Sequence, residues 1–341
     1  MPQGISVVIC CFNSSARITP TLQHLVRQKG IPSSCWEVIL VDNASTDNTA
    51  EKARVIWDGF KFEKPVFRVV EELKPGHSAA RSMGIRESQY DYVLFCDDDN
   101  WLDENYLDVC LDIMKGSAFI GALGGTGTPV FEDKEPPYFW VNQYHTLAVG
   151  RQSSIEGDIT DSRGVLYGAG MIVNKLALNT LMEQFEFRFL VSGRTKGNLI
   201  SSDDHELCLA LKKIGYKIFY SNNLQFKHYI PKFRTTIEYY KRLFFAFGIS
   251  EALLHVYMVT PQNLHYLKND YRYICLRCLK NIFILQIHLI FGGYYFGSDK
   301  YRFVGQLHLL FNNKGKLVTF LKVKNRYKHQ YLTLPLFALK S

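Results

Sequence analysis

Four short apolar runs, separated by stretches with helical periodicity, constrain the fold of this 341-residue chain more than any other feature. The runs that we predict to be buried strands are Ile5–Phe12, Trp36–Val41, Val66–Val70 and Tyr92–Cys96. Apolar residues recur at helical spacing between Ile18 and Val26, and a second helix is predicted from about Ser78 to Glu87. This alternation is typical of a mostly parallel sheet covered by helices, so the sequence predicts an α/β fold.

Acidic residues follow two of these predicted strands. Asp42 ends the second strand, and Asp97, Asp98 and Asp99 follow the fourth. Ligands of open α/β sheets bind outside the carboxyl ends of the strands, so we expect both groups along one rim. Hard cations held by one or two carboxylates usually complete their shell with substrate phosphates. The pattern therefore predicts a divalent metal and a nucleotide diphosphate at this rim.

Two structural alternatives stay open for these acidic residues. Asp42 and Asp47 could be only a helix N-cap pair, since aspartate is a preferred cap. The three aspartates could instead precede a helix that opens over Asn100–Glu104, because a helix N-terminus favours negative charge.

The chain beyond residue 116 continues the pattern and adds a second acidic pair. Residues 129–155 have no clear period, which is typical of a functional loop. A strand is predicted at Val165–Val173 and a helix at about Lys175–Gln184. A helix that begins with Asp203 and Asp204 comes next. The last predicted strand segments are Lys217–Tyr220 and Leu224–His228.

The C-terminal part differs in charge and pattern. From Thr235 onward the sequence has long, aromatic, basic helical segments without strand alternation. Residues 231–341 hold 17 Lys and Arg against 4 Asp and Glu, whereas residues 1–230 hold 23 against 28. The apolar stretch Ile282–Phe296 is shorter than the roughly 20 residues of a spanning helix. We expect this region to bind an anionic membrane surface through Arg272, Arg277, Lys280 and the Lys314–Lys328 cluster, or else to be a helical subdomain with a solvated basic face.

The remaining composition bears on location and partners. Six of the eight cysteines lie mostly in apolar runs and are expected to be reduced, and only Cys275 and Cys278 have the spacing of a metal pair. The start of the chain lacks the charged, long apolar pattern of a signal peptide, so we expect a cytoplasmic enzyme at the inner face of the plasma membrane. Nucleic acid is not an expected partner, because the basic residues are interleaved with apolar runs rather than gathered in a nucleic-acid motif.

The chain resembles glycosyltransferase family 2 enzymes with the GT-A fold, from Ile5 to about Gly248. The motifs that carry the resemblance are Ile5–Asn13, Val41–Asp47, Gly76–Gly84, Asp97–Asp99, Gly168–Met171, Asp203–Leu207 and His228–Arg234. Three positions depart from the family pattern: Cys10 stands where proline is frequent, Ser82 where asparagine is frequent, and Asp203 where glutamate is usual.

The resemblance implies a role for each motif residue. Asp42 would bind the nucleobase, Asp97 the ribose with Asp98 beside it, and Arg81 would lie near the base or the phosphates. Asp99 would bind Mn²⁺ or Mg²⁺ on the donor diphosphate, with His228 as a second candidate ligand. Asp204 is the predicted general base, and Gly168, Gly170 and Asp203 are predicted on the acceptor side.

Structural interpretations compete with several of these roles. Arg81 could face solvent, His228 could be an ordinary strand-end histidine, and Gly168 and Gly170 could be turn glycines. Tyr138, Trp140 and Tyr144 could stack on sugar or simply pack. The glycines of Gly121–Gly127 lack the spacing of a dinucleotide fingerprint, so that interpretation is disfavoured.

The resemblance thus implies a metal-assisted, inverting glycosyltransferase that moves a sugar from a nucleotide-diphosphate donor, expected to be a UDP-sugar, to a glycan or lipid-linked glycan. Residues 1–234 would form the GT-A catalytic domain, with a donor half over about 1–115 and an acceptor half over about 116–234. Residues 235–341 would form the basic helical region. The alternatives are a nucleotidyltransferase with the same acidic metal site and a non-catalytic membrane adaptor.

Overall fold

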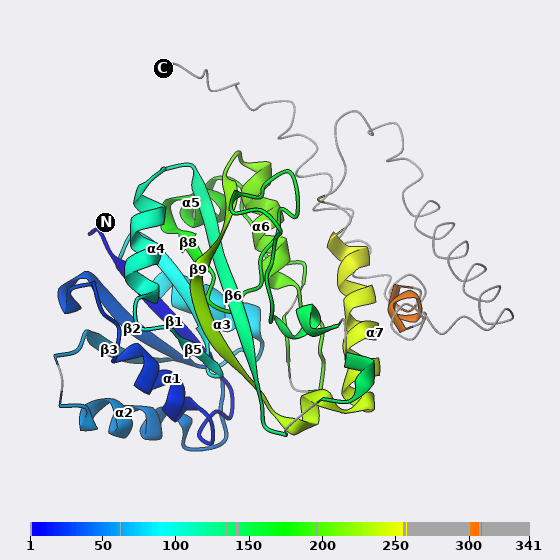
Figure 1. Cartoon of the computed structure of the whole chain (residues 1–341), viewed down its shortest axis with the longest axis horizontal. Helices are drawn as coiled ribbons and strands as arrows, with labels where there is room; N and C mark the ends of the chain where they lie inside the picture. The colour runs from blue at the N-terminus through cyan, green and yellow to red at the C-terminus, as the bar shows by residue number, and fades with distance from the viewer. Residues whose placement is uncertain are drawn as a thin grey trace, which may run out of the picture. The chain divides into compact units, whose positions relative to one another are not determined.

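The computed structural model describes residues 2–61, 63–133, 136–140, 143–191, 193–195, 197–254, 257, 301–306 and 308 (Figure 1). Its strands are β1 (Ile5–Cys11), β2 (Trp36–Asp42), β3 (Val66–Glu71), β4 (Tyr92–Asp97), β5 (Asn100–Leu102), β6 (Ile120–Phe131), β7 (Gly157–Asp158), β8 (Ile172–Asn174) and β9 (Lys217–Ile230). Its α-helices are α1 (Ile18–Leu25), α2 (Thr49–Gly59), α3 (His77–Glu87), α4 (Tyr106–Lys115), α5 (Lys175–Asn179), α6 (Asp203–Lys213) and α7 (Ile237–Leu254).

All nine strands of this described part belong to one mixed sheet. Its order is β3-β2-β1-β4-β8-β6-β9-β5, and β7 pairs with β9. Strands β1 to β4 are mutually parallel, and β6 and β9 are parallel to each other. Strands β8, β5 and β7 pair antiparallel to their neighbours. The predicted α/β class, with a mixed and mostly parallel sheet, is confirmed.

Helices cover both faces of the first four strands, and β1, β2 and β4 are accordingly buried along almost their whole length. Ile5, Val7 and Ile9 of β1 share one core cluster with apolar residues of α1, α2 and α4. Val8 points to the opposite face, because successive strand side chains alternate. There its methyl groups fill the space in which a Cβ on Gly84 of α3 would lie, so helix and strand pack closely. Burial on both faces explains why these parallel strands are uninterrupted apolar runs in the sequence.

The structure corrects three expectations about secondary structure. Asn100–Leu102 forms strand β5, paired with β9, and not the start of a helix. Of the predicted strand Val165–Val173, only Ile172 and Val173 are extended in a ladder, as the first two residues of β8, since Gly170 has φ +69° and turns the chain just before it. The two predicted segments between Lys217 and His228 are one strand, β9, that continues to Ile230.

The backbone contacts divide the chain into two units. One comprises residues 1–197 and 203–236, and the other comprises residues 198–202 and 237–341. Within the second unit, α7 packs on the helical residues 301–306: Arg302 Nη1 lies 3.2 Å from Glu251 Oε1, and a Cβ on Gly248 would overlap the Arg302 backbone. The expected membrane-facing cations Arg272, Arg277, Lys280 and Lys314–Lys328, and the pair Cys275 and Cys278, lie outside the described residues.

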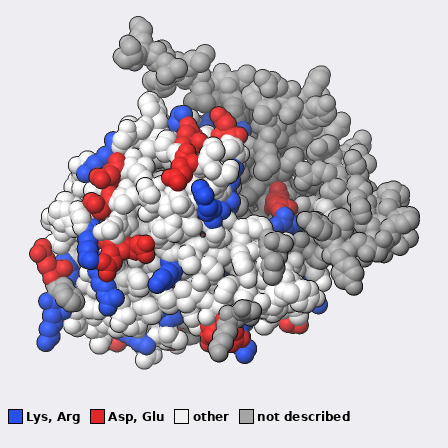
Figure 2. All heavy atoms as spheres, in the orientation of Figure 1, with Lys and Arg blue, Asp and Glu red and all other residues white. Residues whose placement is uncertain are grey.

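Three features of the described residues bear on the remaining sequence-based expectations. On the face drawn in Figure 2, acidic and basic side chains of the described residues are interspersed and form no continuous basic stripe. None of the helices within the described ranges is long and apolar enough to cross a membrane. Cys10, Cys11, Cys35, Cys96, Cys110 and Cys208 carry free thiols, as predicted.

Candidate active site

The first acidic residues meet at the carboxyl edge of the parallel strands, as predicted. Strand β1 lies between β2 and β4, with Cys11 opposite Asp42 and Cys10 opposite Asp97. Asp42 Oδ1 accepts a 3.1 Å hydrogen bond from the Ser45 amide and therefore shapes the turn after β2. Asp42 and Asp97 thus end strands that lie one strand apart on the same rim.

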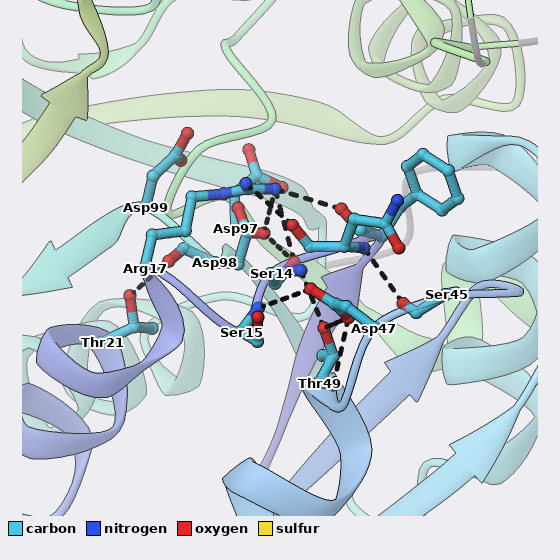
Figure 3. Close-up of polar contacts among 12 residues, drawn as sticks. Ser14, Ser15, Arg17, Thr21, Ser45, Asp47, Thr49, Asp97, Asp98 and Asp99 are labelled. Carbon is cyan, nitrogen blue, oxygen red and sulfur yellow. Dashed lines mark hydrogen bonds and ion pairs between the residues drawn. The ribbon is translucent and has the colours of Figure 1, made fainter.

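Asp47, and not Asp42, contacts the start of helix α2, where the N-cap position itself is Asn48. Helix α2 begins at Thr49, and Asp47 Oδ1 accepts from the Thr49 amide at 3.1 Å. Asp47 Oδ2 also accepts from the Ser15 amide, which ties this turn to the loop after β1 (Figure 3). Hydroxyl and amide donors to Asp47 hold its pKa below the ordinary value, although burial opposes them. Asp42 makes no such contact with the helix start and remains available at the rim.

The carboxylate of Asp98 is held by the loop after β1. Its carboxylate lies 2.6 Å from Arg17 Nη2 and accepts a short hydrogen bond from Ser14 Oγ (Figure 3). Its backbone carbonyl accepts from Thr21 Oγ1 at 2.9 Å. Burial and the adjacent Asp99 raise the pKa of Asp98, whereas Arg17 opposes the rise. These contacts indicate that Asp98 fastens the first loop to the acidic segment.

Asp99 meets His228, and the sheet explains why. Residues of β5 and β9 pair so that Asn100 faces His228, and the Asp99 carbonyl accepts from the Tyr229 amide at 2.9 Å. The Asp99 carboxylate lies 3.3 Å from His228 Nε2 and 3.0 Å from Arg234 Nη1. Burial raises the pKa of Asp99, but His228 and Arg234 outweigh it and hold that pKa well below the ordinary value.

This pair of residues fits a divalent cation as a partial ligand set. Two ligands at about 2.1 Å in neighbouring octahedral positions lie about 3 Å apart, close to the separation of Asp99 Oδ1 and His228 Nε2. The buried Nδ1 of His228 has no hydrogen-bond partner. Within the described ranges, no group of three or more His, Cys, Asp and Glu residues is arranged to hold a metal alone. Phosphate oxygens of a substrate and water would then complete the shell.

Two side chains of helix α3 form ion pairs with Asp203, the first residue of the second acidic pair. Asp203, at the first turn of α6, is buried against two cations from successive turns of α3. Arg81 Nη1 lies 2.9 Å and His77 Nδ1 lies 3.1 Å from Asp203 Oδ2. Burial raises the pKa of Asp203, but Arg81 and His77 outweigh it, so the pKa falls well below its usual range. Arg81 is itself 2 % exposed, which excludes the interpretation that it faces solvent.

Asp204 has a different environment from its neighbour. Its Oδ2 accepts from the Gly168 amide at 2.6 Å, and its Oδ1 accepts from the His205 amide at 2.8 Å. No ion pair involves Asp204 among the described residues. A Cβ on Gly168 would overlap the Arg81 guanidinium, so this position requires glycine to let Arg81 and Asp204 approach the same backbone.

Gly170, Trp140 and Tyr144 fit the structural interpretations, and Tyr138 is mostly exposed. Gly170 has φ +69°, and its carbonyl accepts from Tyr106 Oη at 2.7 Å, so it is a turn glycine. Trp140 is fully buried and donates from Nε1 to the Thr235 carbonyl at 2.9 Å, which makes it a packing residue. Tyr144 packs against Phe131, whereas Tyr138 is 86 % exposed.

Three side chains in this region were not predicted as site residues. His77 joins the two acidic groups, because its Nε2 lies 3.4 Å from Asp97 Oδ1 while its Nδ1 contacts Asp203. Arg17 and Arg234 pair with Asp98 and Asp99. His77 and Arg234 stand inside the quoted motifs Gly76–Gly84 and His228–Arg234, so a signal existed for both, but nothing in their spacing identifies their partners.

Comparison with known proteins supports the same family as the motifs. The family model described as glycosyl transferase family 2 matches residues 6–178, just over half of the chain. A poly-β-1,6-N-acetyl-D-glucosamine synthase of Staphylococcus epidermidis is 28 % identical over 167 residues, which is 48 % of this chain and 38 % of the relative. The synthase of the same name from Staphylococcus aureus strain COL is 30 % identical over 132 residues, 39 % of this chain and 30 % of the relative. The matched part thus spans well under half of these relatives.

Solved structures support the fold. The S. aureus TarS fragment 1–349 in complex with UDP-GlcNAc superposes with a TM-score of 0.50 at 18 % identity, covering 74 % of this chain and 67 % of that fragment. The mannosyltransferase PcManGT from Pyrobaculum calidifontis, in complex with GDP-Man and Mn²⁺, has a TM-score of 0.52 at 16 % identity, covering 98 % of this chain and 89 % of its own. The GT-A architecture predicted from the sequence is confirmed.

Proposed function

Because the chain belongs to glycosyl transferase family 2, we propose that it is an inverting enzyme that transfers a sugar from a UDP-sugar to a glycan or lipid-linked glycan acceptor. One observation carries this proposal. His77 brings Asp97, at the rim predicted to bind the donor, and Asp203, beside the predicted base, onto one imidazole ring. Residues from the two halves of the catalytic domain therefore face a common site.

On the donor side, Asp42 would accept from the nucleobase and Asp97 from a ribose hydroxyl, since both end parallel strands on the same rim. Asp99 and His228 would hold Mn²⁺ or Mg²⁺ together with the donor diphosphate. When bound, the ion would neutralise charge that develops on the departing nucleoside diphosphate. We propose that Asp98 supports this group through Ser14 and Arg17 and does not itself touch the donor.

On the acceptor side, Asp204 would be the general base and Asp203 a positioning residue. Two cations stabilise the ionised form of Asp203 and make it a weak proton acceptor. Within the described part of the chain, Asp204 accepts hydrogen bonds from two backbone amides and has no ion-pair partner. Asp204 would remove the proton of an acceptor hydroxyl as that oxygen forms a bond to the anomeric carbon. The bond from that carbon to the diphosphate breaks on the opposite side, so the configuration inverts. Gly168 would line the acceptor side, with the turn glycine Gly170 shaping the backbone beside it, and Arg81 would hold Asp203.

The choice of UDP-N-acetylglucosamine as the first donor to test follows from the curated relatives, which are named for a polymer of N-acetylglucosamine. We further propose that residues 235–341 bind an anionic membrane surface on the cytoplasmic side. Their excess of Lys and Arg supports this, since each such residue near an anionic surface contributes about 1 kcal/mol to binding. The domain division near residue 234 belongs to the same proposal.

The released product tests the function. Full-length protein would be incubated with Mn²⁺ or Mg²⁺ and a panel of UDP- and GDP-sugars, with and without oligosaccharide acceptors. Release of a nucleoside diphosphate that requires both the acceptor and the metal supports the proposal. Release of pyrophosphate would instead indicate the nucleotidyltransferase alternative, and binding of nucleotide sugars without any turnover would indicate a non-catalytic adaptor. Family membership already favours glycosyl transfer over both.

A further inference from the structure

Each ring nitrogen of His77 forms a hydrogen bond with a different carboxylate. Nε2 lies 3.4 Å from Asp97 Oδ1, and Nδ1 lies 3.1 Å from Asp203 Oδ2. Asp97 ends β4, whereas Asp203 begins α6, more than 100 residues later in the chain. Within the described ranges, His77 is the one side chain that contacts both carboxylates. The ring therefore links the donor rim to the helix that carries the predicted base.

Both ring nitrogens must carry hydrogen for this arrangement to be favourable. An ionised carboxylate only accepts hydrogen bonds, and a neutral imidazole has a single N–H. The protonated ring satisfies both partners at once. Burial and the nearby Arg81 lower the pKa of His77, but Asp203 and Asp97 outweigh them and raise it to about 9. The ring is then charged at neutral pH.

The backbone around His77 fixes the position of the ring. Its amide donates to the Arg194 carbonyl at 3.0 Å, and the next residue, Ser78, donates from Oγ to the Val191 carbonyl at 3.1 Å. The Val191 amide in turn donates to Glu206 of α6 at 2.9 Å. Val191 and Arg194 thus join the start of α3 to helix α6 through hydrogen bonds, so a shift of α6 would be transmitted to His77.

Asp204 benefits from this arrangement without contacting His77. Asp203 forms ion pairs with both His77 and Arg81. Asp204, the next residue on the first turn of α6, accepts a hydrogen bond from the Gly168 amide. The same Gly168 is packed against Arg81, which lies one helical turn after His77. The position of Asp204 therefore depends on how α3 holds Asp203.

We propose that His77 is a positioning residue that ties the ribose-binding Asp97 to Asp203, so that a bound donor and the base Asp204 are held in a fixed relative position. This inference rests on the proposed function, since it takes Asp97 as a donor contact and Asp204 as the base. It predicts two separable effects: the contact with Asp97 governs donor affinity, and the contact with Asp203 governs turnover of bound donor.

Two amide substitutions separate the contacts. In His77→Asn the side-chain NH₂ can replace Nδ1–H toward Asp203, and in His77→Gln it can replace Nε2–H toward Asp97. We expect H77N to weaken binding of UDP, or of the UDP-sugar that the wild type uses, by about tenfold while kcat stays near the wild-type value. We expect H77Q to bind with nearly wild-type affinity while kcat falls by about tenfold or more. His77→Leu should show both losses.

The measurements are nucleotide affinity by titration calorimetry, kcat at saturating donor, and the melting temperature of each variant. A double-mutant cycle provides the control. H77N acts on affinity by removing the contact with Asp97, so in a protein that already carries Asp97→Asn it should cause no further loss of affinity. If H77L does not fold, the H77N and H77Q pair still decides the question.

The outcomes distinguish this inference from the proposed function. Wild-type protein that binds nucleotides but releases no nucleoside diphosphate would refute the proposed function. Wild-type turnover, combined with H77N and H77Q variants that change affinity and kcat alike, would show that His77 is only a structural bridge. Equal melting temperatures with the expected split between Kd and kcat would support the positioning role.

Discussion

Two clusters of buried charge lie at opposite ends of the same parallel strands. At the amino ends, Glu37 of β2 accepts from Ser6 Oγ at 2.8 Å and from the Gln89 amide at 2.9 Å, and it pairs with Arg68 at 3.0 Å. At the carboxyl ends, Asp97 has His77 as its ion-pair partner, and its side chain is still 29 % exposed. In the first cluster, protein groups occupy both carboxylate oxygens of Glu37, whereas the second leaves an accessible carboxylate at its rim.

The comparison shows what distinguishes a structural cluster from a candidate active site. In both, arginine pairs with a carboxylate that is almost completely buried. The carboxyl-edge cluster differs because it contains two adjacent carboxylates in different environments. Asp203 pairs with two cations, whereas Asp204 accepts hydrogen bonds from backbone amides. If the distinction is correct, substitutions at the carboxyl edge should reduce activity, and those at the amino edge should reduce stability.

The largest effect is expected for Asp204→Asn. Removal of a general base reduces rates by about 10²–10⁴-fold. We expect a loss near the upper end, because the neighbouring carboxylate, Asp203, has a lowered pKa and is a poor replacement as a base. Its amide can still accept from Gly168, so the melting temperature should stay within a few degrees of the wild type. The measurement is kcat for nucleoside diphosphate release, with thermal denaturation beside it.

Asp203→Asn is the matched control. It leaves Arg81 buried without its charged partner, so it should lower the melting temperature as well as activity. An Asp203→Asn variant that melts normally but has lost all turnover, beside an active Asp204→Asn, would reverse the assignment of the base.

A smaller loss of activity is expected for Asp99→Asn, which weakens the predicted metal ligand set while keeping its shape. We expect kcat/KM to fall by roughly 10²-fold, since a bound cation supplies several kcal/mol of charge stabilisation. Thermal shift with Mn²⁺ and UDP gives a readout apart from activity: the stabilisation of the wild type should disappear in the variant. Asp133→Asn removes an exposed carboxylate that pairs with Lys232, and it should retain both properties. An undiminished Mn²⁺-dependent shift in Asp99→Asn would place the metal elsewhere.

The contrast also explains which features could be predicted from the sequence. Strands β1, β2 and β4 are buried on both faces and are therefore continuous apolar runs, and the register of a parallel sheet then brings Asp42 and Asp97 to one rim. Composition and periodicity suffice for such features, because they depend on local pattern and on the common direction of neighbouring strands.

Partner choice among the charges could not be predicted in this way. Residues 97, 98 and 99 are all aspartates, yet their side chains pair with His77, Arg17 and His228 respectively, because consecutive side chains point in different directions. His77 and Asp203 are separated by 126 positions, a distance over which no periodicity relates two residues. The strand predicted over Val165–Val173 failed for a local reason, since the turn at Gly170 confines the ladder to Ile172–Asn174.

At the amino edge, Arg68→Met should reduce stability and not turnover. The substitution keeps an apolar stem but leaves Glu37 buried beside Ser6 without its cation. Breaking a buried pair costs about 3–5 kcal/mol, and we expect about 2–3 kcal/mol here because the Arg68 side chain is 28 % exposed. The free energy of unfolding from urea titration measures the loss, and kcat at a permissive temperature should be unchanged. A loss of kcat in folded Arg68→Met protein would erase the proposed difference between the two edges.

The smallest expected effect is a pH dependence of stability that comes from His77. Its pKa is about 9 in the folded protein and near 6.5 when unperturbed, so folding favours the protonated ring. The stabilisation is fully present below pH 6.5 and is lost as the pH rises through 9, because the unfolded chain then releases a proton that the folded chain retains. We expect a decline of about 2 kcal/mol over this interval, somewhat less than the full shift allows, because solvent reaches the ring, whose side chain is 24 % exposed.

The measurement is the free energy of unfolding of wild type and H77Q between pH 6 and 8.5, where Gln does not titrate. Taking the difference between the two proteins cancels the contribution of the buried thiols, such as Cys208, whose pKa burial raises to about 12. Parallel curves for the two proteins would mean that the ring is not held between two carboxylates, and the link between the donor rim and α6 would lose its physical basis.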